Sequence, residues 1–298
     1  MQKRCIMNIR FLRTLVTYAE LGTFVATAKA LGLTQSAVSA QMQTLEEQMG
    51  TQLFDRTKRP PVLNAHGRAL LGSARQILFL YDQMAELVSD SDGFVGTFHI
   101  GAVPTMLTGM LPSVLHVFKS RHPELQLRVS AGTSDVLVTR LDRGELDVAI
   151  ISEPVQLPAS LSWEHFISEP LIVIGPESAK ERSAQSLLQS RPFIRLNRQA
   201  WFGRMVDEKL LELGITVTEG MELDTVDAIS LMVYHGLGVS VVPERHIEDS
   251  LRRPLKRIRF GRPPLSRKIG LSFHKKGPRA RLVDAFYEAL SDAAKSPV

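Results

Sequence analysis

The sequence predicts an α/β protein in which a small helical N-terminal domain is joined by one long helix to a larger domain of alternating strands and helices. Three observations support this architecture. Two short helical segments surround Gly32, an unbroken helical pattern follows over residues 66–89, and strand and helix patterns then alternate to the C-terminus. A length of 298 residues leaves room for more than one domain.

The N-terminal segment contains three predicted helices. The first has one apolar face, formed by Leu12, Leu15, Val16 and Ala19. The second runs from about Phe24 to Ala30. Gly32 can adopt the left-handed conformation that ends a helix, and the Thr34 hydroxyl can accept an N–H of the third helix as its N-cap. Two helices around such a tight turn form a helix-turn-helix.

The third predicted helix has two faces of different chemistry. Its apolar positions, expected to pack inward, are Val38, Met42, Leu45 and Met49. The candidates for DNA contact lie at its tip and polar face: Thr34, Gln35, Ser36, Ser39 and Gln43. Small hydroxyls and amides suit base edges in a major groove, and glutamine can bond adenine with two hydrogen bonds. An ordinary solvated amphipathic helix is the alternative interpretation.

A basic turn follows the third helix. Residues 53–63 contain two short extended stretches around a proline-containing turn, which is the pattern of a wing. Arg56, Lys58 and Arg59 are the candidates for contacts with DNA phosphates. A solvated basic loop is the alternative, but the helix pair and the turn together favour DNA binding.

Residues 7–71 resemble the winged helix-turn-helix of LysR-type transcriptional regulators. The matching runs are residues 26–31, 34–39, 45–50, 52–56 and 63–67. One departure is Ala40, where many members carry arginine, so a possible phosphate or guanine contact is missing. The family pattern begins at Met7, which makes residues 1–6 an expected extension.

The segment over residues 66–89 predicts a linker helix. Apolar residues spaced four and three apart form a heptad seam: Leu70, Ala74, Ile77, Tyr81, Met84 and Val88, widened by Leu71, Leu78 and Ala85. The seam predicts dimerisation, as the resemblance also implies, and burial against its own domain is the alternative. We expect domains over 1–65, 66–91 and 92–298, with a polar hinge at residues 89–93.

Beyond Gly96 the patterns predict a parallel or mixed sheet. The expected strands are 98–103, 126–131, 148–152, 171–175, 255–259 and 268–274, and the expected helices are 106–121, 134–142, 201–213, 226–235 and 278–294. The resemblance implies a two-lobed, periplasmic-binding-protein-like effector domain. Lobe one would cover 93–165 and 266–298, and lobe two 166–265.

The expected effector site lies between the lobes, where four predicted helices begin. Its candidate residues are Thr105, Met106, Thr133, Ser134, Asn197, Arg198, Trp201 and Thr225. Helix N-termini favour anions, and Arg198 could hold a carboxylate. Related regulators carry their effector site in these regions. Asp224 makes a zwitterion an equal candidate to an anion, and simple helix caps are the alternative for the threonines.

Charge and composition exclude some functions. The net charge of +5 arises largely from residues 250–283, which hold twelve basic residues and no acidic one. This run is expected to be a solvated edge, and a second electrostatic contact is the alternative. One cysteine permits no intrachain disulfide, and no apolar stretch reaches transmembrane length. Without a signal-peptide pattern, a cytoplasmic location is expected.

No catalytic, metal-binding or dinucleotide-binding motif stands out, so the sequence does not favour an enzyme and predicts no cofactor. It favours a LysR-type regulator that binds double-stranded DNA and a small-molecule effector as a homodimer or homotetramer. RNA polymerase is a candidate partner. A cytoplasmic α/β enzyme such as a transferase, or a stand-alone solute-binding protein, are the alternatives, and salt-dependent binding to duplex DNA would separate them from the regulator.

Overall fold

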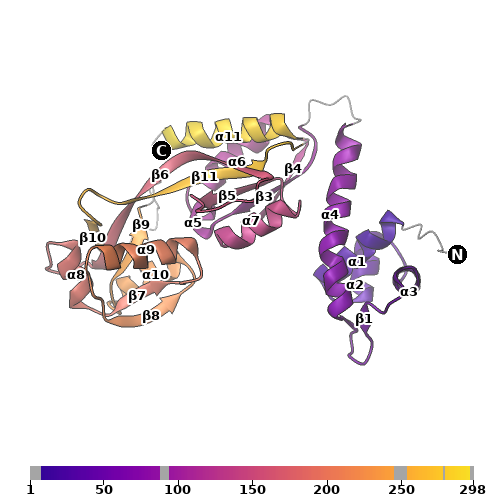
Figure 1. Ribbon diagram of the computed structural model, residues 1–298, viewed down its shortest axis with the longest axis horizontal. Helices are drawn as coiled ribbons and strands as arrows, with labels where there is room; N and C mark the ends of the chain where they lie inside the picture. Colours follow the sequence, from indigo (N-terminus) through magenta and orange to yellow (C-terminus); the bar gives the residue numbers. More distant parts are fainter. Residues whose placement is uncertain (1–7, 88–93, 245–253, 278, 296–298) are drawn as a thin grey trace. The chain divides into compact units, whose positions relative to one another are not determined.

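The computed structural model describes residues 8–87, 94–244, 254–277 and 279–295. The chain forms two compact units, one comprising residues 1–90 with 143–145 and the other residues 91–142 with 146–298 (Figure 1). The predicted hinge at residues 89–93, Val88 and the extension before Met7 lie outside the described residues.

The N-terminal unit is a winged helix-turn-helix. Its elements are α1 (Ile9–Leu21), α2 (Phe24–Leu31), α3 (Gln35–Met49), β1 (Phe54–Asp55), β2 (Val62–Leu63) and α4 (Ala65–Leu87). Gly32 ends α2 in the left-handed conformation at φ 66°, and the Thr34 Oγ1 caps α3 by accepting from Ala37 N at 3.2 Å. The predicted turn and cap are therefore confirmed. The antiparallel pair β1–β2 flanks the wing.

One apolar core holds the helices and the wing together. Leu15, Met42 and Leu45 are fully buried, and the ring of Tyr18 packs between those of Phe24 and Phe54 at 4.6 and 5.0 Å. Gly67 at the start of α4 allows close packing, because a Cβ there would lie 2.3 Å from the Leu53 carbonyl oxygen. Core burial thus fixes both α3 and the wing on α1 and α4.

Helix α4 has buried and exposed apolar positions. Ala74 and Leu78 are buried in the core of the N-terminal unit. Ile77, Leu80, Tyr81 and Met84 are exposed in the single chain, Met84 to 62%. The burial of Ala74 and Leu78 supports packing of the helix against its own domain, and dimerisation through the exposed side chains stays a prediction.

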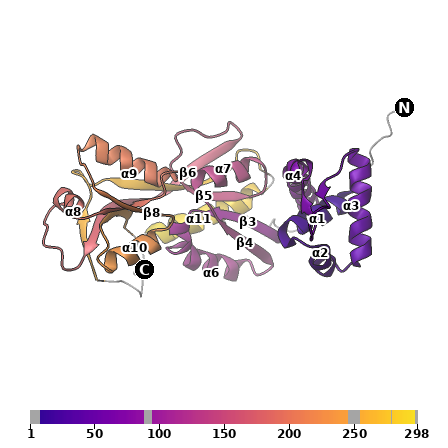
Figure 2. The same ribbon diagram turned by 90° about the horizontal axis from the view of Figure 1, so that it is seen from below.

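Lobe one of the second unit is a five-stranded sheet with helices on both faces. Its strand order is β4–β3–β5–β11–β6, in which β4 (Leu125–Ala131), β3 (Gly96–Ala102) and β5 (Val148–Ser152) are parallel and β11 (Ser266–His274) is antiparallel to both neighbours. Figures 1 and 2 place α7 (Ser134–Asp142) on one face and α6 (Leu111–Arg121) with α11 (Ala280–Lys295) on the other.

The single helix expected over residues 106–121 is wrong. The structure has a short α5 (Pro104–Leu107) and a separate α6. Gly109 disfavours a continuous helix, and Pro112 lacks an N–H, so it suits the first turn of α6, where the structure places it.

Strand β6 (Leu161–Pro176) runs from lobe one into lobe two. Its second half pairs with β9 (Ser240–Pro243) and with β10 (Leu255–Arg259), and β7 (Phe193–Leu196) pairs with β8 (Glu219–Leu223) beside them. Helices α8 (Ala184–Ser190) and α9 (Trp201–Glu212) pack on one side of this sheet and α10 (Val226–Tyr234) on the other. Alternate residues of β6 therefore belong to two separate apolar cores, one on each side. Helix α8, strands β7, β8 and β9 and the first ten residues of β6 were not predicted from the sequence.

Candidate DNA-binding face and effector site

The predicted DNA contacts on α3 share one outer face. Thr34, Gln35, Ser36 and Gln43 are exposed and Ser39 is half-buried, while Val38, Met42 and Leu45 are fully buried on the opposite side. The Thr34 and Ser36 hydroxyls lie 3.0 Å apart at the tip of the helix. The face is therefore built from short polar side chains on a helix that the core holds rigidly.

Arg56 is tied to the protein itself. Its Nη2 lies 2.8 Å from Oε2 of Glu46, a buried carboxylate on α3. The other oxygen of Glu46 accepts the N–H groups of Leu53 at 2.7 Å and Phe54 at 3.2 Å. Glu46 thus joins α3 to the first arm of the wing. Arg56 was predicted to contact phosphate, and the role of Glu46 was not predicted, since nothing in an acidic pair at positions 46–47 marks one member as buried.

The tip of the wing presents the remaining cations. Lys58 and Arg59 are exposed there. The Asp55 carboxylate accepts hydrogen bonds from the Thr57 hydroxyl at 2.6 Å and the Thr57 N–H at 3.0 Å, which lower the pKa of Asp55. The Tyr18 hydroxyl donates to the Pro61 carbonyl and holds the return arm. These contacts order the turn that carries the two cations.

In lobe one, the predicted effector residues differ in accessibility. Thr105 and Ser134 follow the carboxyl ends of the parallel strands β3 and β4, and Thr133 precedes Ser134 half-buried. The Ser134 hydroxyl accepts from Ser152 N at 3.3 Å. Met106, also among the predicted effector residues, is 1% exposed and belongs to the core of lobe one, so its side chain lies in that core and not where a ligand would meet it.

In lobe two, several predicted effector residues have partners on the same lobe. Asn197 donates to Asp224 Oδ1 at 2.8 Å, and Thr225 caps α10 by accepting from Ala228 N at 3.2 Å. The Arg198 guanidinium pairs with Glu219, and its backbone N–H donates to Glu222 at 3.0 Å. Strand β8 therefore supplies carboxylates beside Arg198, and its predicted contact with an effector carboxylate stays a prediction.

Two polar bridges connect the lobes. Asp135 of α7 accepts from the Trp201 indole N–H and, at 3.1 Å, from Arg204 Nη2, both on α9. The Thr108 hydroxyl after α5 lies 3.3 Å from Asp227 of α10. Trp201 thus bonds across the junction between the lobes, and its role in binding an effector stays a prediction.

The buried cation of the junction is Arg267, another residue missed from the sequence. It is the second residue of β11, lies directly opposite Glu169 of β6 and is 3% exposed. Its guanidinium pairs with Glu169, donates to Thr105 Oγ1 at 2.8 Å, and lies 5.0 Å from the ring centre of Phe202. The only sequence signal was an arginine inside a basic run, which favoured solvent.

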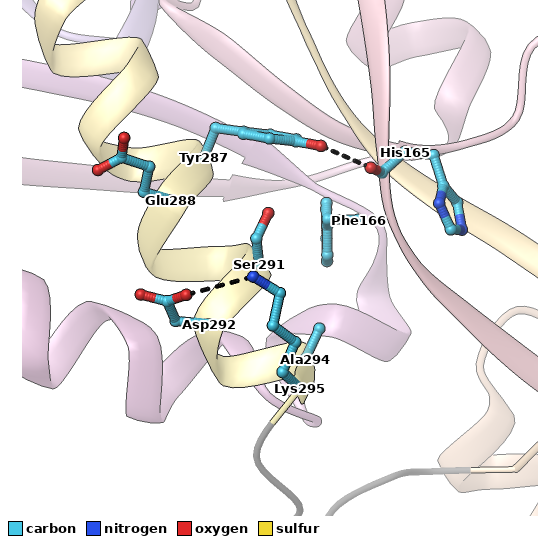
Figure 3. A pocket seen from close by; sticks show the side chains of 8 residues that line it. All are labelled: His165, Phe166, Tyr287, Glu288, Ser291, Asp292, Ala294 and Lys295. Atoms are coloured by element: carbon cyan, nitrogen blue, oxygen red, sulfur yellow. Dashed lines mark hydrogen bonds and ion pairs between the residues drawn. The ribbon is translucent and has the colours of Figure 1, made fainter.

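A pocket of about 410 Å³ lies elsewhere on lobe one (Figure 3). Its lining residues come from β6 and α11: His165, Phe166, Tyr287, Glu288, Ser291, Asp292, Ala294 and Lys295. The Tyr287 hydroxyl donates to the His165 carbonyl at 2.7 Å across its upper wall. None of the predicted effector residues lines it.

Neither metal chemistry nor a membrane span emerges from the described part of the chain. Its histidine, cysteine, aspartate and glutamate side chains form no group of three suited to a metal ion. Among the helices that the structure describes, none combines the length and apolar character that crossing a bilayer requires.

A winged helix-turn-helix joined to a two-lobed α/β domain defines a DNA-binding regulator with a ligand-binding type of domain. Family comparison agrees: residues 9–68 match the bacterial regulatory helix-turn-helix protein, lysR family, and residues 91–295 match the LysR substrate binding domain. The chain belongs to the LysR family of bacterial transcriptional regulators, whose members are regulators and not enzymes.

Individual relatives support the same assignment over nearly the whole chain. The uncharacterized HTH-type transcriptional regulator YeiE of Escherichia coli K12 is 32% identical, over 89% of this chain and 91% of its own. A full-length point variant of OxyR from Pseudomonas aeruginosa superposes with a TM-score of 0.72 at 25% identity, covering 97% of this chain and 95% of its own. CbnR, a LysR family transcriptional regulator, superposes with a TM-score of 0.73 at 23% identity, covering 97% of this chain and 100% of its own. The structure of CbnR complexed with its target DNA gives a TM-score of 0.71.

Proposed function

We propose that this regulator places α3 in the DNA major groove and the wing tip on the phosphate backbone. The observation that carries the proposal is the single outer face of Gln35, Ser36, Ser39 and Gln43, set against a fully buried opposite face. Lys58 and Arg59 are the proposed phosphate contacts, and Arg56 is a support of the wing. Comparing the wild type with Ser39→Glu on a selected operator tests the base-contact part, because a glutamate in the groove should abolish the preference for that operator.

The proposed assembly is a homodimer or homotetramer formed through α4. Four large apolar side chains on one stretch of that helix are exposed in the single chain, and the heptad spacing suits a second copy of the same helix. DNA sites bound by dimers have two half-sites, so the proposal also implies a roughly symmetric operator. RNA polymerase is a further proposed partner, and the bacterial cytoplasm, where the DNA lies, is the proposed location.

The proposed effector is a small anion or zwitterion bound at the junction between lobes. Support comes from the hydroxyls of Thr105 and Ser134 beside the parallel strand ends and from the bridges that Asp135 and Asp227 make across the junction. A ligand that changes these bridges would change the relation between the lobes. Allosteric control of DNA binding requires two such arrangements of the lobes, which the ligand binds with different affinity.

Calorimetric titration with small carboxylates and amino acids tests the effector site. A ligand identified with the wild type should bind Thr105→Val at least tenfold more weakly, on the order of one lost charge-assisted hydrogen bond, and Thr105→Ser nearly normally. Arg198→Ala should have little effect, since its guanidinium is paired with Glu219. Equal affinity for wild type and Thr105→Val would place the effector elsewhere.

The exposed part of the basic run at residues 250–283 is proposed to be a solvated edge, whereas Arg267 of the same run is buried. Its described part includes β10, the last strand of its sheet, where Arg257 and Arg259 are exposed and Lys256 Nζ donates to the Ala179 carbonyl at 3.0 Å. Exposed positive charges discourage pairing with another strand. Arg252 and Arg253 lie outside the described residues, and a second electrostatic contact remains the competing proposal.

A further inference from the structure

The junction between the lobes contains a buried ion pair whose cation lies beside Thr105. Arg267 and Glu169 face each other on β11 and β6, with side chains 4% and 7% exposed. Nε of Arg267 donates to Glu169 Oε2 at 3.0 Å, and Nη2 donates to both that oxygen and Thr105 Oγ1. The hydrogens of one guanidinium nitrogen diverge, so the carboxylate and the hydroxyl lie on different sides of Nη2. The cation is therefore the nearer charge to Thr105.

This arrangement fixes the orientation of the Thr105 hydroxyl. A guanidinium only donates, so the Thr105 oxygen must accept from Arg267 and its own proton must point away. No described residue is seen to accept that proton. Thr105 is 9% exposed at the carboxyl end of the parallel strands, which is where α/β domains bind ligands. The hydroxyl is thus a donor, polarised by the cation behind it.

The same guanidinium contacts both lobes. Thr105 belongs to α5 of lobe one, whereas the Phe202 ring under the guanidinium belongs to α9 of lobe two. The aromatic face and the Glu169 carboxylate hold the cation from two further directions. Arg267 is therefore locked in place, and it can fix the position of the hydroxyl without touching a ligand.

We infer that Arg267 is a positioning and specificity residue, which orients the Thr105 hydroxyl as a donor and makes this end of the junction select a carboxylate over a neutral group. The inference rests on the proposed effector site and adds the atom that the ligand meets and the charge that it carries. Glu169 limits the selectivity, because its negative charge offsets part of the positive field. Neutralising Glu169 should therefore strengthen the preference for a carboxylate, and that preference should depend on the Thr105 hydroxyl.

The test compares two matched probe pairs, acetate with acetamide and phenylacetate with phenylacetamide, which differ mainly in charge. Ligand-observed saturation-transfer NMR on the full-length protein gives the ratio of the two affinities. The wild type should prefer the carboxylate. Glu169→Gln keeps an oxygen for Arg267 and should raise the preference roughly tenfold, the size expected of one charge interaction near a protein surface. Thr105→Val should abolish the preference, and Thr105→Ser should keep it.

A matched control lies one residue along β11. Lys268 pairs with Glu153 at 2.9 Å, but this pair is about half exposed, so Glu153→Gln should leave the preference unchanged. If Glu169→Gln alone is too unstable to measure, the double variant Arg267→Gln with Glu169→Gln has no buried charge and should show no preference. Melting curves confirm that each variant is folded.

The outcomes separate the inference from the effector site itself. A preference that is unchanged or reduced in Glu169→Gln, or retained in Thr105→Val, overturns the role of Arg267. If both probes of a pair bind all variants equally, the inference fails while a ligand site at the junction stands. If neither probe binds any variant, the inference and the proposed effector site at this junction fail together.

Discussion

At the scale of single residues, the three exposed cations of the wing differ in one respect, because only Arg56 is seen to pair with a buried carboxylate among the described residues. Lys58 and Arg59 are exposed at the tip, whereas Arg56 pairs with Glu46 at 2.8 Å. Glu46 is 9% exposed and also holds two backbone N–H groups of the wing. A buried carboxylate that loses its cation destabilises its surroundings more than an exposed pair would. Removing Arg56 should therefore affect the stability of the fold, whereas removing Lys58 or Arg59 should affect DNA affinity.

Alanine substitution in the wing tests this distinction. Lys58→Ala and Arg59→Ala should each lower affinity for all DNA sequences alike and reduce the slope of log affinity against log salt by about 0.9, the value for one phosphate contact. Arg56→Ala should instead lower the melting temperature with a smaller change in slope. Fluorescence anisotropy over a range of salt concentrations measures the slopes. An equal loss of slope in Arg56→Ala would return that residue to the phosphate contacts.

At the scale of elements, α4 buries some apolar side chains in the core of the N-terminal unit and leaves others, including Ile77 and Met84, exposed. Ile77→Asp would place a charge in the proposed seam between two copies, at a cost of several kcal/mol, typically about 3, if the partner helix buries it. Sedimentation should then show monomer or a much weaker oligomer. Val155→Asp replaces an apolar side chain that is 99% exposed in the other unit and should sediment as the wild type does. Wild-type sedimentation of Ile77→Asp would show that this face does not join the copies.

The end of α6 provides a pH-dependent element. His122 stacks on Phe94 at 4.1 Å and contacts Phe118 at 4.8 Å, and burial, with a smaller effect of the Arg121 cation, lowers the pKa of His122. The unfolded chain then binds more protons than the folded chain between that lowered pKa and about 6.5. The contribution of His122 is complete above about pH 6.5 and is lost as the pH falls toward the lowered pKa.

Melting curves between about pH 7.5 and 5 test this linkage. His122→Phe keeps an aromatic ring for the stack but cannot be protonated, so its melting temperature should fall less on acidification than that of the wild type. His116→Gln, on the exposed side of the same helix, is the matched control and should follow the wild type. An identical acid response in wild type and His122→Phe would contradict the assignment.

At the scale of the whole molecule, the sequence predicted those features that depend only on neighbouring residues. The cap at Thr34, the turn at Gly32 and the bounds of α7 follow from neighbouring residues and agree with the structure. The roles of Arg267 and Arg198 depend on partners 98 and 21 residues away in the chain, Glu169 and Glu219. Nothing in the sequence distinguishes the two arginines. The buried Arg267 was therefore missed, and the surface residue Arg198 was predicted to be the cation of the effector site.

The length of β6 was missed for a related physical reason. Its first half has an irregular burial pattern, with adjacent exposed positions at Glu164 and His165, and pairs only with β11, which lies about a hundred residues later. Pairing of distant segments is set by tertiary packing and leaves little periodic signal. The same is true of β7, β8 and β9, which are four or five residues long.

The central claim is that α3 determines which DNA sequence the regulator binds. Selection from a random duplex pool, followed by binding to the selected operator and to an unrelated duplex, tests it most directly with the wild type, Ser39→Glu and Ser39→Ala. Ser39→Glu should lose its preference for the operator through repulsion in the groove while still folding, whereas Ser39→Ala should keep most of the affinity. If Ser39→Glu selects and binds the same operator as tightly as the wild type, the α3 face does not determine the sequence and the account is wrong.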